Sequence, residues 1–531
     1  MERARTTDAH FDPRLLAFLR DPDSYPHHPA EIHELHTHAS LVFIVPPFVY
    51  KIKKPVDFGF LDFSTLAKRR HFCEREVELN SRLAPGIYLG VETITREGGG
   101  FSFGGIGPVA ECAVKMLRMP ADGFMDARID AGTAGEAELE RVAAVLADFY
   151  RKQPSPPDVA EWGTVEKLRI STDENFSQTG AFIGKTLSRG AFDAIRAFTE
   201  NGYERHRHLF DQRVAAGWIR DCHGDLHLDH VHVTDDALHI YDCIEFNDRF
   251  RHLDVASDVA FLAMDLDYHQ RPDLAAFFVR RVANLLGDPG MAGLMDFYKC
   301  YRAYVRGKVE SLHTVAEIAD DAERAEAATR ARRYFQLALQ YAVCGSLPVV
   351  MVFMGRVASG KSTLARAVSR ELGWHLVSSD ERRKTLAGVP LHQRGDAASR
   401  KALYSARMTD LTYDSMIRDA DEALSAGHGL ILDATFSKCS SRDRLREELG
   451  DRKPVWILTE VDESAARTRL ERRDHLDNVV SDARGEDHDF LNAAFEAPDE
   501  LPGNSVFAIN TAGDTGETVR TLLMKMATGL R

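Results

Sequence analysis

The amino-acid sequence predicts two fold classes in tandem, an α+β domain over residues 1–345 and an α/β domain with a parallel sheet over residues 346–531. First, the chain has 531 residues, which is more than one ordinary hydrophobic core accommodates. Second, short apolar runs alternate with helical stretches throughout the last third, and this alternation is typical of a parallel sheet covered by helices on both faces. Third, the earlier part opens with strand patterns and then turns largely helical, which favours an α+β arrangement.

The composition is that of a globular protein, because 44% of the residues are hydrophobic and 28% are charged. No stretch approaches the roughly 18 apolar residues of a membrane helix, and the opening residues, MERARTTDAHFDPR, lack the apolar core of a secretion signal. We therefore expect a cytoplasmic protein without a membrane partner. The seven cysteines form no CxxC pair, so we expect reduced thiols instead of disulfides or a zinc knuckle.

The net charge of −14 argues against a broad nucleic-acid-binding surface, because phosphate backbones are held mainly by dense Lys and Arg. Most of the excess negative charge lies in residues 1–345. A nucleic-acid groove in residues 346–531 therefore stays open, although the composition does not favour one.

The first predicted elements are two strands, SLVFIV and FVYKIK, joined by Pro46-Pro47 in a hairpin-like arrangement. The second strand carries Lys51. The stretch that follows, AKRRHFCEREVELNSRLA, has a helical pattern and carries Glu76. In kinases a lysine on such a strand binds the α and β phosphates of the nucleotide, and a glutamate on the next helix is its ion-pair partner.

The most informative part of the first domain is DCHGDLHLDHVHVTDDALHIYDCIEFND, residues 221–248. His223-Gly224-Asp225, then an apolar strand pair, then Asp242, follow the order of a kinase catalytic loop. Asp225 would orient and deprotonate an acceptor hydroxyl, and Asp242 would hold Mg²⁺ across the β and γ phosphates. The second metal-ligand position, five residues after Asp225, is occupied by His230.

The first two thirds of the chain resemble the aminoglycoside phosphotransferase family, a branch of the protein-kinase-like fold, and in particular the branch fused to a P-loop kinase. The strings VYKIKKPVDFGFLDFSTLAKRRHFCEREVELN and CHGDLH…YDCIEFNDRFRHLDVASDVAFLAMDL carry this resemblance. It implies a bilobal domain with an N-lobe at about 30–112, a C-lobe at about 120–345 and a connection around Glu111 to Pro120. It also implies ATP between the lobes and phosphoryl transfer to a small-molecule hydroxyl.

His230 departs from the family pattern, in which this position is Asn. An Asn carbonyl oxygen binds Mg²⁺, whereas His presents a nitrogen or, when protonated, no lone pair. A second interpretation of the same stretch is a metallo-hydrolase cluster, because DLHLDH differs from HxHxDH only at Asp225. The residues of that cluster would be His223, His227, Asp229, His230 and His232. Strand alternation would place some of them on opposite faces, which favours the kinase loop.

Residues 315–343 are rich in Ala, Glu and Arg with apolar residues at helical spacing, which predicts a long helix or helix pair. CGSLP breaks this pattern, and the buried-strand pattern VVMVFM begins at once, so we place the domain boundary there. The strands predicted after it are VVMVFM, WHLVS, GLILD, PVWIL and SVFAIN, and predicted helices follow Lys361 and cover residues 402–426, 442–449 and 464–473.

GRVASGKST fits the phosphate-binding pattern GxxxxGK[ST] and lies between a predicted strand and a predicted helix. Backbone N–H groups of such a loop surround phosphate oxygens, the lysine reaches the β and γ phosphates, and the serine ligates Mg²⁺. The sequence thus predicts an ATP and Mg²⁺ site formed by Gly355, Ser359, Gly360, Lys361, Ser362 and Thr363.

Carboxylates follow the next two strands. Asp380 in SSDERRK comes directly after WHLVS, where it could accept the proton of an attacking hydroxyl, and Arg383 one turn later could hold an anionic substrate. The alternative for Asp380 is an ordinary helix N-cap. Asp433 ends GLILD, a position suited to a Walker-B-like metal ligand or to substrate contact.

ARTRLERRD lies on a predicted helix that could close over the nucleotide and aim Arg469 or Arg473 at the transferred phosphoryl group. The block that contains Gly355, SSDERRK, LILDATF and VSDA resembles the zeta-toxin, gluconate-kinase and polynucleotide-kinase group of small P-loop kinases. In phage-type polynucleotide kinases a DxxR stretch supplies the base and a phosphate-binding arginine, which this resemblance places at Asp380 and Arg383.

The sequence therefore predicts an ATP-dependent phosphotransferase with two kinase sites that act on a small-molecule hydroxyl. The alternative is an N-terminal domain that only binds nucleotide or substrate and regulates the P-loop domain, which alone would be active, for example as a polynucleotide 5′-hydroxyl kinase. His230 motivates this alternative.

Overall fold

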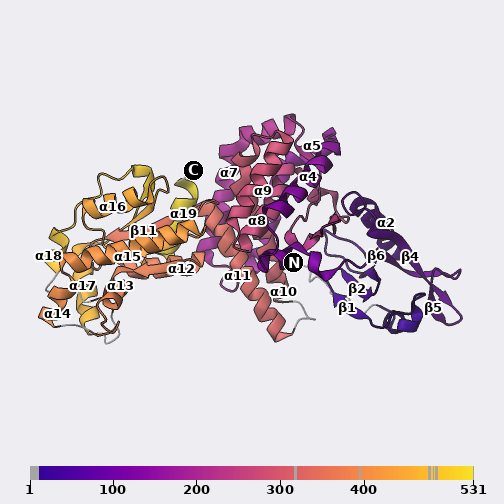
Figure 1. The fold of residues 1–531 in the computed structure, drawn as a ribbon, viewed down its shortest axis with the longest axis horizontal. Coiled ribbons are helices and arrows are strands. Elements are labelled where there is room, and N and C mark those ends of the chain that lie inside the picture. Colours follow the sequence, from indigo (N-terminus) through magenta and orange to yellow (C-terminus); the bar gives the residue numbers. More distant parts are fainter. Residues whose placement is uncertain are drawn as a thin grey trace. The chain divides into compact units, whose positions relative to one another are not determined.

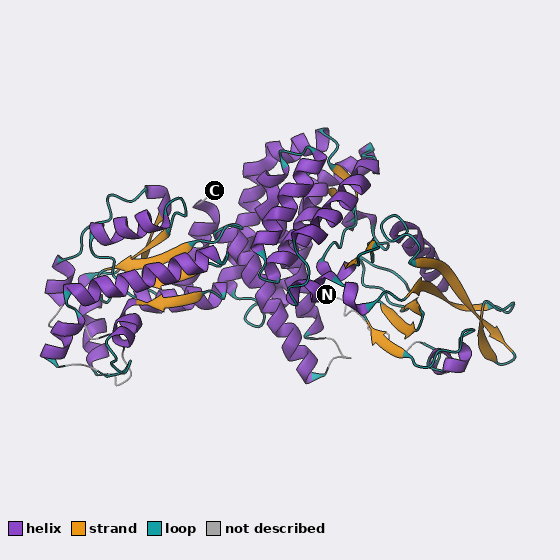
Figure 2. Cartoon of the chain, in the orientation of Figure 1, coloured by secondary structure: helices purple, strands orange, loops and turns teal. Residues whose placement is uncertain are grey.

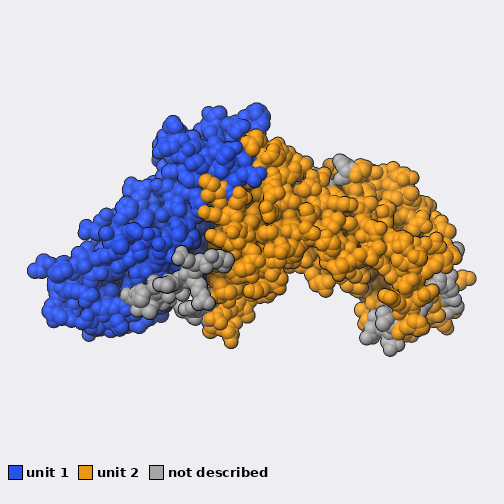
Figure 3. Space-filling view, turned by 180° about the vertical axis from the view of Figure 1, so that it is seen from behind, with its two compact units in different colours: residues 1–169, 208–295 blue, residues 170–207, 296–531 orange. Residues whose placement is uncertain are grey.

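The computed structural model describes residues 11–315, 320–393, 396–475, 480–481, 484 and 488–529 (Figures 1 and 2). The chain divides into two compact units, Met1–Arg169 with His208–Met295 and Ile170–Arg207 with Asp296–Arg531 (Figure 3). Residues 296–343, which we expected in the first domain, thus lie in the same unit as the C-terminal sheet. A domain boundary at residue 345 stays a prediction. None of the helices in the described ranges is long and apolar enough to cross a membrane.

The first unit contains a six-stranded antiparallel sheet in the order β1-β2-β3-β6-β4-β5. Its strands are β1 His33–His36, β2 Ser40–Val45, β3 Phe48–Lys53, β4 Tyr88–Glu97, β5 Gly100–Phe103 and β6 Val109–Leu117. The predicted hairpin is confirmed as β2 and β3. β6 runs on to Leu117, so the sheet extends past residue 112 and into the segment that we expected to connect the lobes.

Two helices, one on each face, cover this sheet. α1, Pro13–Leu19, packs with alternate residues of β2 and β3, such as Phe43 and Ile52, in one hydrophobic core. α2, Leu66–Asn80, packs against β4 and β6 on the opposite face. Because side chains alternate along a strand, β3 sends Tyr50 and Ile52 to the first core and Lys51 and Lys53 toward α2.

Helices dominate residues 121–343, as the sequence predicted. They are α3 Met125–Asp130, α4 Glu136–Lys152, α5 Pro157–Ala160, α6 Val165–Thr179, α7 Arg189–Ala215, α8 Val255–Tyr268, α9 Pro272–Leu286, α10 Met295–His313 and α11 Asp321–Val343. Short strands β7 Ile219–Asp221 and β10 His252–Asp254 pair with each other, and β8 Val231–Val233 pairs with β9 Leu238–Ile240. The helix expected over residues 315–343 covers α11, and residues 316–319 lie outside the described ranges.

The second unit contains a five-stranded parallel sheet in the order β12-β13-β11-β14-β15. The strands are β11 Val350–Gly355, β12 His375–Ser378, β13 Leu430–Asp433, β14 Val455–Glu460 and β15 Val506–Asn510. The helices that follow β11 in this unit are α12 Lys361–Leu372, α13 Ser379–Leu386, α14 Ala397–Leu403, α15 Ala406–Ser425, α16 Cys439–Leu449, α17 Glu463–Asp474, α18 His488–Ala493 and α19 Thr515–Gly529. All five predicted strands are confirmed to within two residues.

The parallel sheet is buried on both faces, as its unbroken apolar runs predicted. Val350, Val352 and Met354 of β11 pack in one core with apolar residues of α15 and α16. α12 and α19 contact each other and the strands from the other face. Helices on both faces leave the carboxyl ends of the strands as the open edge, which is where ligands of such sheets bind.

Candidate active sites

Lys51 joins two elements of the first unit that are far apart in the sequence. Its Nζ lies 2.6 Å from Oδ1 of Asp242 and 2.9 Å from Oε1 of Glu76 on α2. Burial alone would lower the pKa of Lys51, but the two carboxylates raise it well above its usual value. The structure therefore brings together the lysine, the glutamate and the metal-binding aspartate that the sequence predicted.

A second lysine, which we did not predict as a site residue, supports this arrangement. Lys53 lies two residues further along the same face of β3, with Nζ 2.6 Å from Oε2 of Glu76, and it also contacts Glu245. The Lys53 side chain is 1% exposed, whereas that of Lys51 is 16% exposed. Lys51 is thus the lysine that remains open to a ligand, and Lys53 holds Glu76 in place.

The loop that carries Asp225 is shaped by two aspartates on α8. Asp258 accepts hydrogen bonds of 2.9 Å from the backbone N–H groups of both His223 and Gly224, and Asp265 accepts one of 2.8 Å from Leu228. Asp258 and Asp265 are seven residues apart and therefore lie on one face of the helix. This apolar helix with two aspartates at such spacing was a sequence signal that we did not use.

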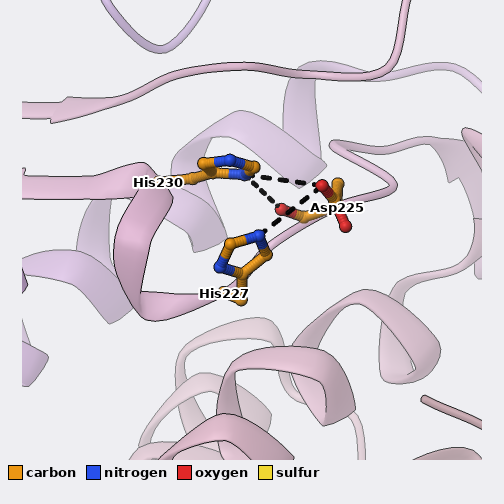
Figure 4. A group of neighbouring side chains, drawn as sticks. All are labelled: Asp225, His227 and His230. Atoms are coloured by element: carbon orange, nitrogen blue, oxygen red, sulfur yellow. Dashed lines mark hydrogen bonds and ion pairs between the residues drawn. The ribbon is translucent and has the colours of Figure 1, made fainter. Parts of the chain in front are cut away.

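Asp225, His230 and Asp242 lie together, in the order expected of a kinase catalytic loop. His230 Nδ1 lies 2.9 Å from the backbone oxygen of Asp225, and His230 Nε2 lies 3.5 Å from Oδ2 of Asp242 (Figure 4 shows the first contact). Asp242 has a φ of 61°, in the left-handed region that a non-glycine residue adopts only when its surroundings enforce it. Burial alone would raise the pKa of Asp242, but the neighbouring Lys51 ammonium holds it far below its usual value.

The proposed hydrolase-type cluster does not come together as a whole. His223 Nε2 lies 2.9 Å from the backbone oxygen of Tyr241, and His232 Nε2 lies 2.9 Å from that of Pro120, so each ring is tied to a different segment. Asp225, His227 and His230 do place one possible metal-ligand atom each within 4.8 Å of one another (Figure 4). Of the five residues, His227 and His230 therefore converge on Asp225, and Asp229 lies with its Oδ2 3.6 Å from the other ring nitrogen of His227, Nδ1.

The phosphate-binding loop joins β11 to α12, as predicted. Three of its residues, Gly355, Ala358 and Gly360, have positive φ, and Gly360 caps the N-terminus of α12. At Gly360 a Cβ atom would lie 2.9 Å from the Thr511 hydroxyl, so the loop needs glycine here for space as well as for conformation. Lys361 Nζ donates to the backbone oxygen of Arg356 at 2.8 Å.

The carboxyl ends of β14 and β15 contact this loop. Ser359 is 2% exposed, and its hydroxyl lies 2.6 Å from that of Thr459 at the end of β14. The Thr511 hydroxyl, just after β15, donates to the backbone oxygen of Ser359 at 2.6 Å. We did not predict Thr459 or Thr511, although both follow from the rule that parallel strands end at one edge.

Asp433 lies at the end of β13, beside the loop. It is 3% exposed, and burial raises its pKa, while a hydrogen bond from Ser362 and the charge of Lys361 oppose that shift. Burial lowers the pKa of Lys361 to about 8, although Asp433 and Asp380 act to raise it. Ser362 and Asp433 are thus placed where both could bind one Mg²⁺, and Thr363 is exposed on α12.

Asp380 and Arg383 lie on α13, at the next strand end. Arg383 is 6% exposed, donates from Nη1 to the backbone oxygen of Leu403 and to the Thr409 hydroxyl, and lies 4.7 Å from the ring centre of Tyr404. The Tyr404 hydroxyl donates to Asp380 at 3.3 Å. Asp380 is half-buried and lies near enough to Lys361 to act on the lysine pKa, whereas the buried Arg383 contacts the chain around Tyr404.

The two arginines predicted on the lid helix, α17, both lie near the loop. Arg469 donates from Nη1 to the backbone oxygen of Ala358 at 3.3 Å and to the Thr511 hydroxyl at 3.0 Å. Arg473 lies close enough to Lys361 to depress the lysine pKa. A further residue that we did not predict, Asn492 of α18, accepts a hydrogen bond of 3.1 Å from the backbone N–H of Val357.

Similar proteins were found as a family model, as solved structures and as whole sequences. A family model described as an AAA domain matches residues 350–498. A gluconokinase structure from Sinorhizobium meliloti 1021 is 19% identical and covers 34% of this chain and 93% of its own, with a TM-score of 0.26. A choline/ethanolamine kinase family structure from Mesorhizobium loti is 13% identical and covers 61% of this chain and 99% of its own, with a TM-score of 0.36.

The predicted fold classes are confirmed in their broad form, because an antiparallel sheet with a largely helical region is followed by an α/β domain with a parallel sheet, over which the family model matches. Over 417 residues the chain is 33% identical to the uncharacterized protein Rv2004c of Mycobacterium tuberculosis (strain ATCC 25618 / H37Rv), and to Mb2027c of Mycobacterium bovis. The aligned residues make up 78% of this chain and 80% of each relative. The chain therefore belongs to the same protein family as Rv2004c and Mb2027c.

Proposed function

We propose that the protein is an ATP-dependent phosphotransferase with two kinase sites, each of which transfers the γ-phosphate to the hydroxyl of a small molecule. The observation that carries this proposal is the buried Lys361 in a loop of positive-φ residues at the carboxyl end of β11. Its neighbours Ser362 and Asp433 fit a magnesium ion, which would screen the phosphate charge when bound. Asp380 at the next strand end would accept the proton of the attacking hydroxyl.

The first domain supports a second site of the same class. Lys51 would exchange its contact with Asp242 for the α and β phosphates while Glu76 keeps it in place. Asp225 lies on a loop shaped by α8 and would orient and deprotonate the acceptor. Asp242 would hold the metal ion.

Single-turnover transfer from γ-labelled ATP to a pool of metabolites tests both sites. We expect Lys361→Ala to lower transfer to the P-loop acceptor by about 10²–10³, because the phosphate loses its main cation. Asp225→Asn should lower transfer to the other acceptor by about 10²–10⁴. Lys453→Met, at an exposed lysine of the second unit, serves as the control. If the double variant Asp225→Asn/Lys361→Ala transfers phosphate as fast as the unaltered chain, the proposal is wrong.

A second candidate function has one specific observation in its favour, since His230 replaces the oxygen ligand expected for Mg²⁺. In this candidate the first domain binds nucleotide or substrate without transferring phosphate, and the P-loop domain acts alone, with polynucleotide 5′-hydroxyl ends as an alternative acceptor. Asp225→Asn would then leave all transfer intact. Oligonucleotide phosphorylation that Lys361→Ala removes would identify the nucleic-acid acceptor.

A further inference from the structure

We infer that the first domain binds a first-row transition metal ion through the Nε2 atom of His230 and the Oδ2 atom of Asp242, in preference to Mg²⁺. This inference rests on the proposed kinase-type site of that domain and names the metal that the site would take. Two observations support it. The Nε2 atom of the His230 ring faces Asp242, and the two oxygens of Asp242 contact different residues, Oδ1 Lys51 and Oδ2 His230.

The contact of His230 with the backbone determines which ring nitrogen can bind a metal. Nδ1 lies 2.9 Å from the backbone oxygen of Asp225, and a carbonyl oxygen can only accept a hydrogen bond. Nδ1 must therefore carry the proton in this contact. In the neutral ring the lone pair then lies on Nε2, the nitrogen that faces Asp242.

The two oxygens of Asp242 have different partners. Oδ1 lies 2.6 Å from the Lys51 ammonium, and Oδ2 lies 3.5 Å from His230 Nε2. Two ligands bound about 2.1 Å from one metal ion lie roughly 3.0–3.4 Å apart, so a small movement of either side chain would complete the pair. A direct hydrogen bond from a charged His230 to Asp242 would instead be about 2.7–2.9 Å long. The observed spacing is closer to that of two ligands of one ion.

The group Asp225, His227 and His230 is the competing metal site in the same loop. His227 Nε2 lies 3.6 Å from Oδ2 of Asp225, and His230 Nδ1 lies 3.7 Å from the same oxygen. This site would need the lone pair of Nδ1, the nitrogen that donates to the Asp225 backbone oxygen. Binding there would break the contact that orients the His230 ring, so we place the metal on the Asp242 side.

The ligand types decide which metal the site favours. Magnesium takes oxygen ligands almost exclusively, whereas imidazole nitrogen suits manganese, iron, cobalt and zinc increasingly well. Replacing an oxygen ligand by His230 therefore weakens Mg²⁺ and strengthens the transition metals at one position of the site. Asp242 supplies the negative charge that both kinds of ion require.

Pulsed electron paramagnetic resonance of bound Mn²⁺ tests the inference directly, because it detects a coordinated imidazole nitrogen as a modulation of the signal. The measurement uses the full chain with Lys361→Ala, so that the P-loop site contributes less, together with a non-hydrolysable ATP analogue. We expect nitrogen modulation in the chain with His230 and none in His230→Asn. The ratio of Mg²⁺ to Mn²⁺ needed for half displacement should fall at least about tenfold in His230→Asn. Asp242→Asn should weaken Mn²⁺ binding.

His227→Gln is the matched variant that separates the two sites, and circular dichroism of each variant checks that it folds. If His227→Gln keeps the nitrogen modulation, the His230 and Asp242 site is supported. Modulation that is lost in His227→Gln, absent from the chain with His230, or retained in His230→Asn would overturn the inference. None of these signals requires turnover. A nitrogen signal in a domain that transfers no phosphate would count against the proposed function alone, and transfer without a nitrogen signal would count against the metal site alone.

Discussion

The two candidate sites hold their lysines in opposite ways. Lys51 contacts the carboxylates of Glu76 and Asp242, which raise its pKa, whereas Lys361 donates to the backbone oxygen of Arg356, and burial lowers its pKa to about 8. The first site therefore carries its own counter-charges, and a nucleotide must displace one of them. Among the described residues, the hydrogen-bond partner of Lys361 is an uncharged backbone oxygen, and a bound phosphate would be a stronger partner.

This contrast also reflects how each site is assembled. The kinase-type site joins β3, α2 and the segment around Asp242, which are distant in the sequence, so its geometry depends on the stability of the unit. Most of the P-loop site, in contrast, comes from one contiguous segment between β11 and α12. Substitutions in the first site should thus alter folding and function together, whereas those in the second should alter mainly function.

The largest expected effect is on the stability of the first unit. Glu76→Gln removes the carboxylate that Lys51 and Lys53 share, and Glu76 is fully buried, so we expect the local free energy of unfolding to fall by about 3 kcal/mol. Hydrogen exchange of peptides from β3 and α2 measures this change. Glu78→Gln on the same helix is the control, because Glu78 is exposed and its ion pair with Arg75 lies at the surface, and we expect a change below about 0.5 kcal/mol. Equal protection in the two variants would show that the shared pair does not stabilise the unit.

The next effect is a pH dependence that should appear at the P-loop only. Binding of phosphate requires protonated Lys361, and with a pKa of about 8 the free site loses this proton as the pH rises from 7 to 9. We therefore expect the Kd for ADP, measured calorimetrically without Mg²⁺, to rise about tenfold over this range, or about 1.4 kcal/mol. Lys361→Arg keeps its charge and should show little change. A flat profile in the chain with Lys361 would mean that its pKa is not lowered.

The same contrast explains what the sequence could predict. The P-loop follows from one contiguous pattern with a strand before it and a helix after it, so Gly355, Lys361 and Ser362 were found together. Lys51, Glu76 and Asp242 were found through their order and a family resemblance. The sequence analysis named Lys51 alone, and the structure supplies the physical reason, because Lys51 and Lys53 share one face of β3 but differ in exposure and in the contact with Asp242.

Residues that support the sites from a distance escaped prediction. Asn492 contacts the P-loop from a segment that follows it by more than a hundred residues and lies in no recognisable pattern, whereas the position of Thr511 after the last predicted strand was a signal that we did not use. Arg383 was predicted to hold a substrate, but its burial against Tyr404 could not be inferred from its position after a strand. Its role stays a prediction. Tertiary packing determines such contacts, so they cannot be predicted from the residues that are adjacent in the sequence.

The smallest expected effect concerns the helix above the P-loop. Arg469 uses its planar group to contact both Ala358 and Thr511, and a lysine cannot reproduce this two-pronged geometry. We therefore expect Arg469→Lys to weaken ADP binding about threefold to tenfold, since the loop loses about 1 kcal/mol of support in its binding conformation. Arg467→Lys, on the exposed side of α17, should change the Kd less than twofold, because its partners Glu463 and Asp489 are exposed. If both variants bind ADP equally well, α17 does not position the loop. The P-loop would then hold its binding conformation without α17, unlike the Lys51 site, which is assembled from distant segments.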